Sequence, residues 1–270
     1  MSTWHSGRSS RDGRRLRLLA AIVLLALGGL WLPVGSARAA GPITVGCVGT
    51  VGDTAELLGA ISRANASAGS DTISLGASCV YTLGAVNNST GGPNGLPVIT
   101  GDLTIEGNGA TITRGATAPA FRILKNASTL TLRNLTLANG LASGGNGGAI
   151  YNTGSLTLVS STVIGSSARG AGGSSNKGGS GGGQGGAIYN TGTLVLNAST
   201  LANNRALGGN GVSRSHADSG GGGGGGAGIG GAIYSAGASS VTIINRTLSG
   251  NQAIGGQGGA GGDNGGSYSG

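Results

Sequence analysis

The chain has 270 residues, of which 62 are glycine and only 9% are charged, against usual shares of about 7% and about 25%. Five prolines, and the lack of glycine at every third position, exclude a proline-rich tail and a collagen. Six of the sixteen basic residues lie between Arg8 and Arg38, and from Ala40 onward ten basic residues are scattered among seven acidic ones. A nucleic-acid binder gathers basic and aromatic side chains on one face, so we expect no nucleic-acid partner.

Residues 1–39 have the pattern of a signal peptide. Basic residues from Arg8 to Arg17 precede fifteen apolar residues, Leu18 to Leu32, and Ala37-Arg38-Ala39 fits the small-x-small cleavage rule. The alternative is a retained membrane anchor, but fifteen residues fall short of the roughly twenty that span a bilayer. We therefore expect cleavage near Ala39/Ala40 and a secreted or cell-surface protein. Membrane association is expected only through the export signal or through a missing carboxy-terminal anchor.

Residues 40–100 contain both cysteines. They are expected to form the start of the folded part of the chain, a cap and the first coils of the repeat fold described below. An even pair in an exported chain favours a disulfide between Cys47 and Cys79, with two buried free thiols as the alternative. Zinc requires four ligands, and no histidine lies near this pair. We therefore expect no metal site and no cofactor.

The strongest pattern is an internal repeat within residues 101–254. Gly-Gly-Ala-Ile-Tyr at Gly147 recurs at Gly185 and Gly230, and a short alternating strand follows each copy. No helical segment separates the strands, which excludes a βαβ fold, and a β-sandwich would not repeat one motif in one order. Stacked coils of short strands would bury one continuous inner face. The pattern predicts an all-β protein, a right-handed parallel β-helix (a solenoid).

Equivalent residues of such coils form ladders. We expect Ile150, Ile188 and Ile233 to point inward, and Tyr151, Tyr189 and Tyr234 to stack outward as an aromatic column; Asn152 and Asn190 are expected to form an amide ladder at a turn. A ladder could line a binding groove, but we interpret these ladders as devices that fix the register of the coils.

The extra length between repeats falls at one place in each coil. The inserts, residues 166–184 and 206–229, are rich in glycine, and we expect them to be mobile surface loops. Residues 255–270 look like a third insert with no coil after it. This end indicates a glycine-rich loop or a truncated gene product.

The Gly-Gly-Ala-Ile-Tyr-Asn motifs resemble those of polymorphic outer-membrane proteins, whose second motif survives in part as Leu201-Ala202-Asn203-Asn204. The segment Glu56 to Ile61, followed by Asp71-Thr72-Ile73, resembles a CSLREA-type amino-terminal segment. That resemblance implies a short helical cap on the open end of a pectin-lyase-like β-helix, and Leu57, Leu58 and Ile61 do fall on one helical face. It also implies a bacterial surface protein.

The β-helix fold also occurs in pectin-degrading enzymes, so the fold alone cannot exclude catalysis, and the question depends on which residues the chain carries. Glycoside hydrolysis needs two facing carboxylates, and only Asp102 and Glu106 border a predicted strand; none occurs between Glu106 and Asp218. His216, beside Asp218 in an insert, is interpreted as a chance neighbour. We predict no catalytic residues and a structural or adhesive module whose partners are surface or matrix glycans or proteins. The alternative is a polysaccharide lyase or glycoside hydrolase.

Overall fold

The computed structural model describes residues 1–3, 41–174, 181–213 and 222–261. The chain divides into two units, Met1–Arg38 and Ala39–Gly270, and only the second is described below. Residues 4–39 of the predicted signal peptide lie outside the described residues, as do His216 and Asp218. Among the described residues no helix is long and apolar enough to cross a membrane.

The second unit is predominantly β, and almost all of its strands pair in parallel. The seven-stranded sheet contains, in order of pairing, β1 (Ile43–Val45), β4 (Ser70–Leu75), β6 (Asp102–Glu106), β9 (Thr129–Arg133), β13 (Ser155–Val159), β18 (Thr193–Asn197) and β23 (Ser240–Ile244). The eight-stranded sheet contains β2 (Cys47–Val48), β3 (Val51–Gly52), β5 (Val80–Leu83), β7 (Thr111–Arg114), β10 (Thr136–Ala138), β14 (Thr162–Ile164), β19 (Thr200–Ala202) and β24 (Thr247–Ser249). In this sheet β2 and β3 form the one antiparallel pair among the named strands.

Three smaller sheets complete the unit. The tyrosine sheet contains β8 (Leu124–Asn126), β12 (Ile150–Asn152), β17 (Ile188–Asn190) and β22 (Ile233–Ser235). The alanine sheet contains β11 (Leu141–Ser143), β15 (Ser167–Arg169), β20 (Arg205–Leu207) and β25 (Gln252–Ile254). A two-stranded sheet pairs β16 (Gly183–Gln184) with β21 (Gly228–Ile229).

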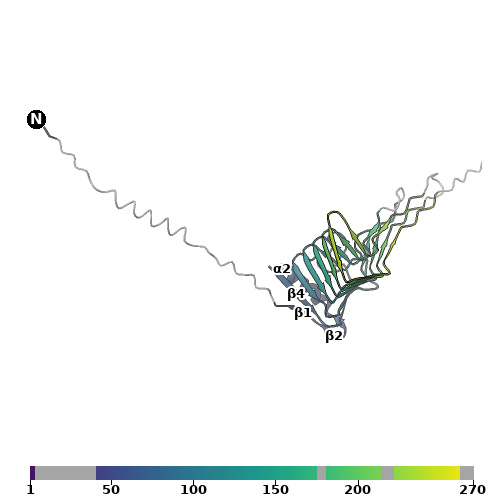
Figure 1. Ribbon diagram of the computed structural model, residues 1–270, viewed down its shortest axis with the longest axis horizontal. Helices are drawn as coiled ribbons and strands as arrows, with labels where there is room; N and C mark the ends of the chain where they lie inside the picture. The colour runs from purple at the N-terminus through teal and green to yellow at the C-terminus, as the bar shows by residue number, and fades with distance from the viewer. Residues whose placement is uncertain (4–40, 175–180, 214–221, 262–270) are drawn as a thin grey trace, which may run out of the picture. The chain divides into compact units, whose positions relative to one another are not determined.

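The chain visits these sheets in a recurring order, which we call a circuit. Strands β12, β13, β14 and β15 lie in the tyrosine, seven-stranded, eight-stranded and alanine sheets, and β17 to β20 and β22 to β25 follow the same order. Figure 1 shows the strands of successive circuits lying side by side. This topology is compatible with a β-helix.

Alternation of side chains along each strand builds the core. In β13, Leu156 and Leu158 are fully buried while Thr157 between them is half-buried on the other face, as period-two strand geometry requires. Register pairing carries one such position through the whole seven-stranded sheet. Its members are Ile43, Ile73, Ile105, Leu132, Leu158, Leu196 and Ile243.

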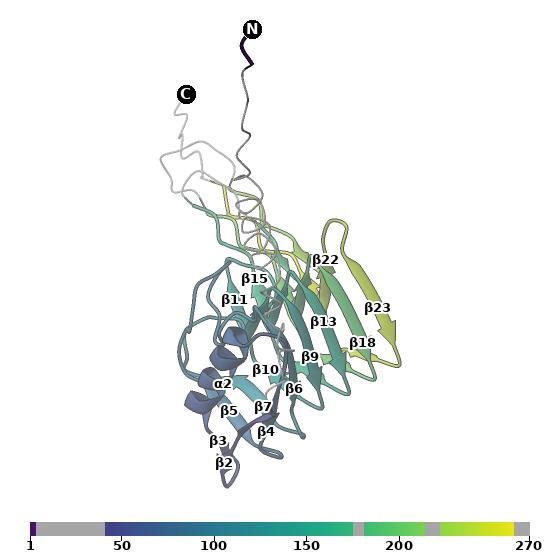
Figure 2. The ribbon, with the colours of Figure 1, turned by 90° about the vertical axis from the view of Figure 1, so that its left-hand side faces the viewer.

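One helix, α2 (Thr54–Ala66), is present among the described residues. Asp53 caps its amino terminus, since its carboxylate accepts a hydrogen bond from the Glu56 amide at 2.8 Å. Leu57 and Ile61 are fully buried, and the helix packs against strands of the first circuits, including β1 and β4. Figure 2 shows α2 at one end of the stack and β23 at the other.

The predicted disulfide between Cys47 and Cys79 is confirmed, with Cα atoms 6.2 Å apart. It joins β2 to the segment just before β5, and α2 and β4 lie between the two cysteines in the sequence. Beside it, the Tyr81 hydroxyl donates to the Val45 carbonyl at 2.8 Å. Burial is the main cause that raises the pKa of Tyr81.

The described parts of the glycine-rich inserts differ from the predicted mobile loops. The first insert, residues 166–184, contains β15 and β16, and the second, residues 206–229, contains the end of β20 and all of β21. Beyond these strands the backbones still pair: the Gly170 amide donates to Leu207, Gly173 to Asn210 and Gly211 to Gln257, at 2.7–2.8 Å. We call residues 170–174, 181–184, 208–213, 222–229 and 255–261 the glycine extension; in Figure 1 it projects from the stack as adjacent traces.

The physical reason for this order is the close approach that glycine permits. A Cβ atom on Gly208 would lie 1.9 Å from the Gly226 carbonyl oxygen, and one on Gly183 would lie 2.2 Å from that of Ala168. Layers with side chains pack about 10 Å apart, whereas these layers pack backbone against backbone. The small size of glycine therefore explains the structure of the described parts of the inserts, whereas the mobility expected of the inserts stays a prediction.

Candidate functional site

The structure brings each predicted ladder together in register. Ile150 pairs with Ile188, and Ile188 with Ile233, in the tyrosine sheet. Ile150 and Ile188 are fully buried, while Ile233 is half-buried because no described strand pairs with the outer edge of β22. The three positions therefore form one inward column whose last member is less covered.

The tyrosine column lies on the opposite face of the same strands. The Tyr151 and Tyr189 rings are 5.0 Å apart and nearly parallel, with 2° between their planes, and Tyr189 and Tyr234 are 5.4 Å apart at 23°. These separations follow the strand spacing of about 4.8 Å. Burial, more than the neighbouring phenols, raises the pKa of Tyr189, and a hydrogen bond with Asn146 opposes the shift.

Two cationic side chains lie near the ring of Tyr151, the first tyrosine of this column. The Lys125 Nζ and the Arg122 guanidinium carbon lie 5.5 Å and 5.2 Å from the Tyr151 ring centre, within the range of a cation–π contact. Lys125 is also the register partner of Tyr151. Neighbours or cations thus occupy both faces of Tyr151 and Tyr189, which leaves little aromatic surface on which a sugar ring could stack.

Arg122 is a buried cation, 2% exposed. Its Nη1 donates to the Gly91 carbonyl at 2.9 Å and to Asn94 Oδ1 at 3.2 Å, while its Nε has no hydrogen-bond partner in the described residues. Desolvation lowers the pKa of this guanidinium, and the charge of Tyr151 opposes the shift. Sequence reasoning missed Arg122, because neither its spacing nor its neighbours set it apart from a surface arginine.

The amide ladder is longer than the sequence predicted. Asn126 Nδ2 donates to Asn152 Oδ1 at 2.8 Å, and Asn152 Nδ2 donates to Asn190 Oδ1 at 2.7 Å. All three side chains are fully buried. Asn126 lacks the Gly-Gly-Ala-Ile-Tyr motif, but it precedes Leu130 by four residues, as Asn152 precedes Leu156 and Asn190 precedes Leu194. That offset was the signal that could have identified it.

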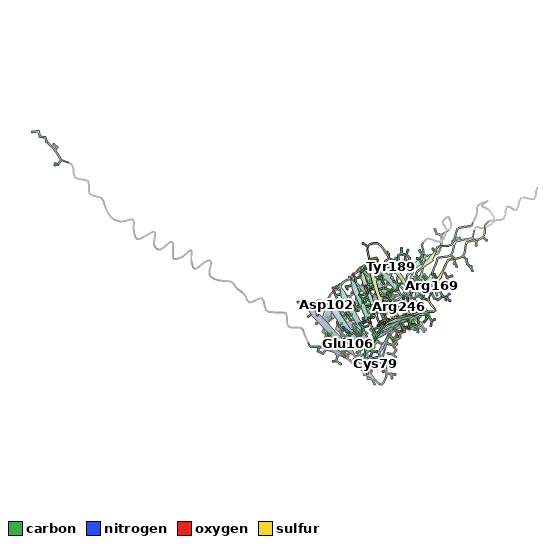
Figure 3. The ribbon with its side chains drawn as sticks, in the orientation of Figure 1. Cys79, Asp102, Glu106, Arg169, Tyr189 and Arg246 are labelled. Carbon is green, nitrogen blue, oxygen red and sulfur yellow. A yellow bond between two sulfur atoms is a disulfide. The ribbon has the colours of Figure 1, made fainter. Side chains whose placement is uncertain are left out.

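The two carboxylates considered for catalysis lie on β6, and each has a partner. Asp102 accepts a hydrogen bond from Ser70 Oγ at 2.5 Å, and Glu106 forms an ion pair with Arg133 at 3.3 Å. Four residues of strand separate their Cα atoms by roughly 13 Å. Figure 3 shows both residues on the side of the stack away from Arg169. Among the described residues, no group of three or more His, Cys, Asp or Glu side chains could hold a metal ion.

Two cavities follow the outer face of the alanine sheet. One cavity of about 520 Å³ is lined by Arg169, Leu207, Asn210 and Ile254, and a second of about 440 Å³ by Arg114, Leu141 and, again, Arg169. Because Arg169 lines both, we treat them together as the arginine groove. Within the described part of the chain, neither cavity is lined by a carboxylate or an aromatic side chain.

Strand alternation explains why these side chains face outward. In the alanine sheet the middle residues Ala142, Ala168 and Ala206 are buried, so the residues on either side of each point away from the core. Arg169 and Leu207 are register partners, as are Leu207 and Ile254. The glycine extension begins where these strands end and supplies a further part of the lining, including Gly170 and Gly209.

Arg114 is held in place at the other end of the groove. Its Nε donates to the Asn139 carbonyl at 3.0 Å, and its Nη1 donates to the carbonyls of Gly115 and Ala118 at 3.1 and 2.7 Å. These three acceptors are neutral, so they orient the guanidinium without cancelling its charge. The groove was not predicted, because Arg114 and Arg169 are 55 positions apart in the sequence.

Comparison of the chain with protein-family models, with curated proteins and with solved structures finds no match.

Proposed function

We propose that the chain is an exported right-handed parallel β-helix capped by α2, and that it is a non-catalytic structural or adhesive module, secreted or at the cell surface. The polymorphic outer-membrane type repeats and the CSLREA-type segment belong to this proposal, as does a pectin-lyase-like fold.

The observation that carries the proposal is the continuous register of the stack. One inward position runs through seven strands from Ile43 to Ile243, and the circuit order recurs through the tyrosine, seven-stranded, eight-stranded and alanine sheets. Stacked circuits give a rigid body with long, regular outer faces, which suits a structural or binding role. The signal-peptide pattern of residues 1–39 supports export.

Two measurements test the proposal. When the gene is expressed in a bacterium, the mature protein should appear outside the cytoplasm with its amino terminus at Ala40, and Ala39→Arg should leave the precursor uncleaved. The mature protein should also attach to a glycan array or to a cell surface. A protein that stays in the cytoplasm contradicts the proposed export, and one that binds to none of these surfaces contradicts the adhesive role.

The alternative function is a polysaccharide lyase or glycoside hydrolase, and the observation that favours it is the pair of carboxylates on β6, Asp102 and Glu106. Such an enzyme would release reducing ends or unsaturated products from a polysaccharide. Loss of that release in Asp102→Asn or Glu106→Gln, with retention in Arg246→Gln, which changes an exposed arginine, would establish the enzyme and overturn the non-catalytic role.

A further inference from the structure

We propose that the arginine groove binds a linear anionic polysaccharide lying across the strands of the alanine sheet. This inference rests on the proposed function, since it names the class of partner for a non-catalytic module. The groove has three properties that select such a ligand, and each is argued in turn.

The first property is positive charge that no described residue neutralises through an ion pair. Arg114 and Arg169 line the groove, and the described residues show no ion pair for either one. The sequence has no carboxylate between Glu106 and Asp218, so the segment that contains both Arg114 and Arg169 offers no acidic partner. Guanidinium groups bind carboxylate and sulfate oxygens in a two-pronged geometry, which makes an anionic group the complementary ligand.

The second property is length. Leu141, Arg169, Leu207 and Ile254 belong to β11, β15, β20 and β25, four consecutive strands of one sheet. At a strand spacing of about 4.8 Å, the first and fourth strands lie roughly 14 Å apart. The groove therefore matches an extended chain of several units better than a single small ion.

The third property is the mixture of polar and aliphatic lining. Asn139, Asn210 and Gln257 offer amide groups to hydroxyls, whereas Leu207 and Ile254 offer aliphatic contact to the C–H faces of sugar rings. Single-stranded nucleic acid, the other linear polyanion, is held mainly by stacking on aromatic side chains, and no described residue lining the groove is aromatic. The lining thus favours an acidic polysaccharide.

The test is a binding titration of the mature protein, which begins at Ala40 and lacks the arginine-rich signal peptide, with heparin, polygalacturonate, neutral dextran and oligo(dT). We expect heparin, polygalacturonate or both to bind, with affinity that falls as salt rises; the pair distinguishes sulfate from carboxylate recognition. Arg169→Gln should weaken this binding at least about tenfold, the size of one charge-assisted contact. Arg169 is exposed, so its replacement should leave the fold intact, as circular dichroism can verify.

Arg246→Gln is the matched control, because Arg246 is also exposed and does not line the groove; it should change the affinity less than about twofold. Equal losses in both variants, equal affinity for dextran, tighter binding of oligo(dT), or no binding of either anionic polymer would overturn the inference. The polymer's chain length is measured after each titration. A shortened polymer contradicts the non-catalytic role, whereas an intact, unbound polymer contradicts the groove assignment alone.

Discussion

At the scale of single residues, the buried asparagines hold the corner between the tyrosine sheet and the seven-stranded sheet. Besides its contact with Asn190, the Asn152 amide donates to the carbonyls of Gly154 and Thr193 at 3.1 and 3.0 Å. The Gly154 carbonyl also accepts a hydrogen bond from the Thr193 amide at 2.9 Å, so the side-chain amide is a second donor at this buried corner. The ladder ends with Ser235, whose hydroxyl accepts from Asn190 at 3.1 Å.

Asn152→Ala should therefore destabilise the protein strongly. The change leaves the Asn126 amide and two corner carbonyls without this partner in a buried site, at a cost of about 2–4 kcal/mol. Urea denaturation followed by circular dichroism measures the loss. Asn87→Ala removes the same side chain from an exposed position and should cost less than about 0.5 kcal/mol; equal losses would show that the ladder has no special role.

At the scale of elements, the glycine extension continues the alanine sheet into a region where neighbouring backbones lie too close together for side chains. Gly183 packs under this sheet, and a Cβ there would lie 2.2 Å from the Ala168 carbonyl oxygen and 2.5 Å from that of Leu207. The space inside the coils thus narrows: leucine and isoleucine fill it beside the seven-stranded sheet, alanine beside the alanine sheet, and glycine in the extension. Hydrogen bonds between backbones replace side-chain packing, as between the Gly226 amide and the Gly209 carbonyl at 2.7 Å.

Gly209→Ala should open the extension without unfolding the stack. The new methyl group would overlap the Ala171 carbonyl, so residues 208–213 and 222–228 should exchange their amide hydrogens roughly ten times faster by mass spectrometry, while β9 and β13 remain protected. Gly224→Ala is the control, because a Cβ there meets nothing within 4 Å. Identical exchange in the two variants would argue against the close packing.

At the scale of the whole molecule, coverage of the core is uneven along the stack. Leu156 and Leu194 are fully buried in β13 and β18, whereas their register partner Val241 in β23 is 36% exposed. In the eight-stranded sheet, Leu201 is buried and its partner Leu248 is 44% exposed. The first circuits are covered by α2, whereas no described strand covers the last circuit.

Native-state hydrogen exchange should reveal this gradient. Amides of β9 and β13 should be the slowest, and those of β23 and β24 should exchange at least about a hundredfold faster, because they can separate without disturbing the rest. Exchange in the last circuit that is as slow as in β13 would indicate a cover that the described residues lack.

Features that repeat along the chain could be predicted from the sequence, whereas features formed by side chains from different circuits could not. Period-two alternation and the spacing of Gly-Gly-Ala-Ile-Tyr predicted parallel strands and placed Ile150, Tyr151 and Asn152 beside their counterparts, since register follows from repetition. The arginine groove and buried Arg122 depend on side chains from different circuits, and no local pattern encodes that meeting. The strands and backbone hydrogen bonds in the described parts of the glycine inserts were not predicted, because their hydrogen-bond partners lie in neighbouring inserts that are distant in the sequence.

The position of the disulfide limits how long the core stays exposed when α2 detaches from it. Because Cys47 precedes α2 and Cys79 follows β4, the helix sits inside a covalent ring anchored at both ends to the first circuits. If α2 detaches, it remains tethered beside its own binding site at an effective concentration on the order of millimolar. Recapture is then an intramolecular event, so the apolar interior at that end is exposed to other molecules only briefly.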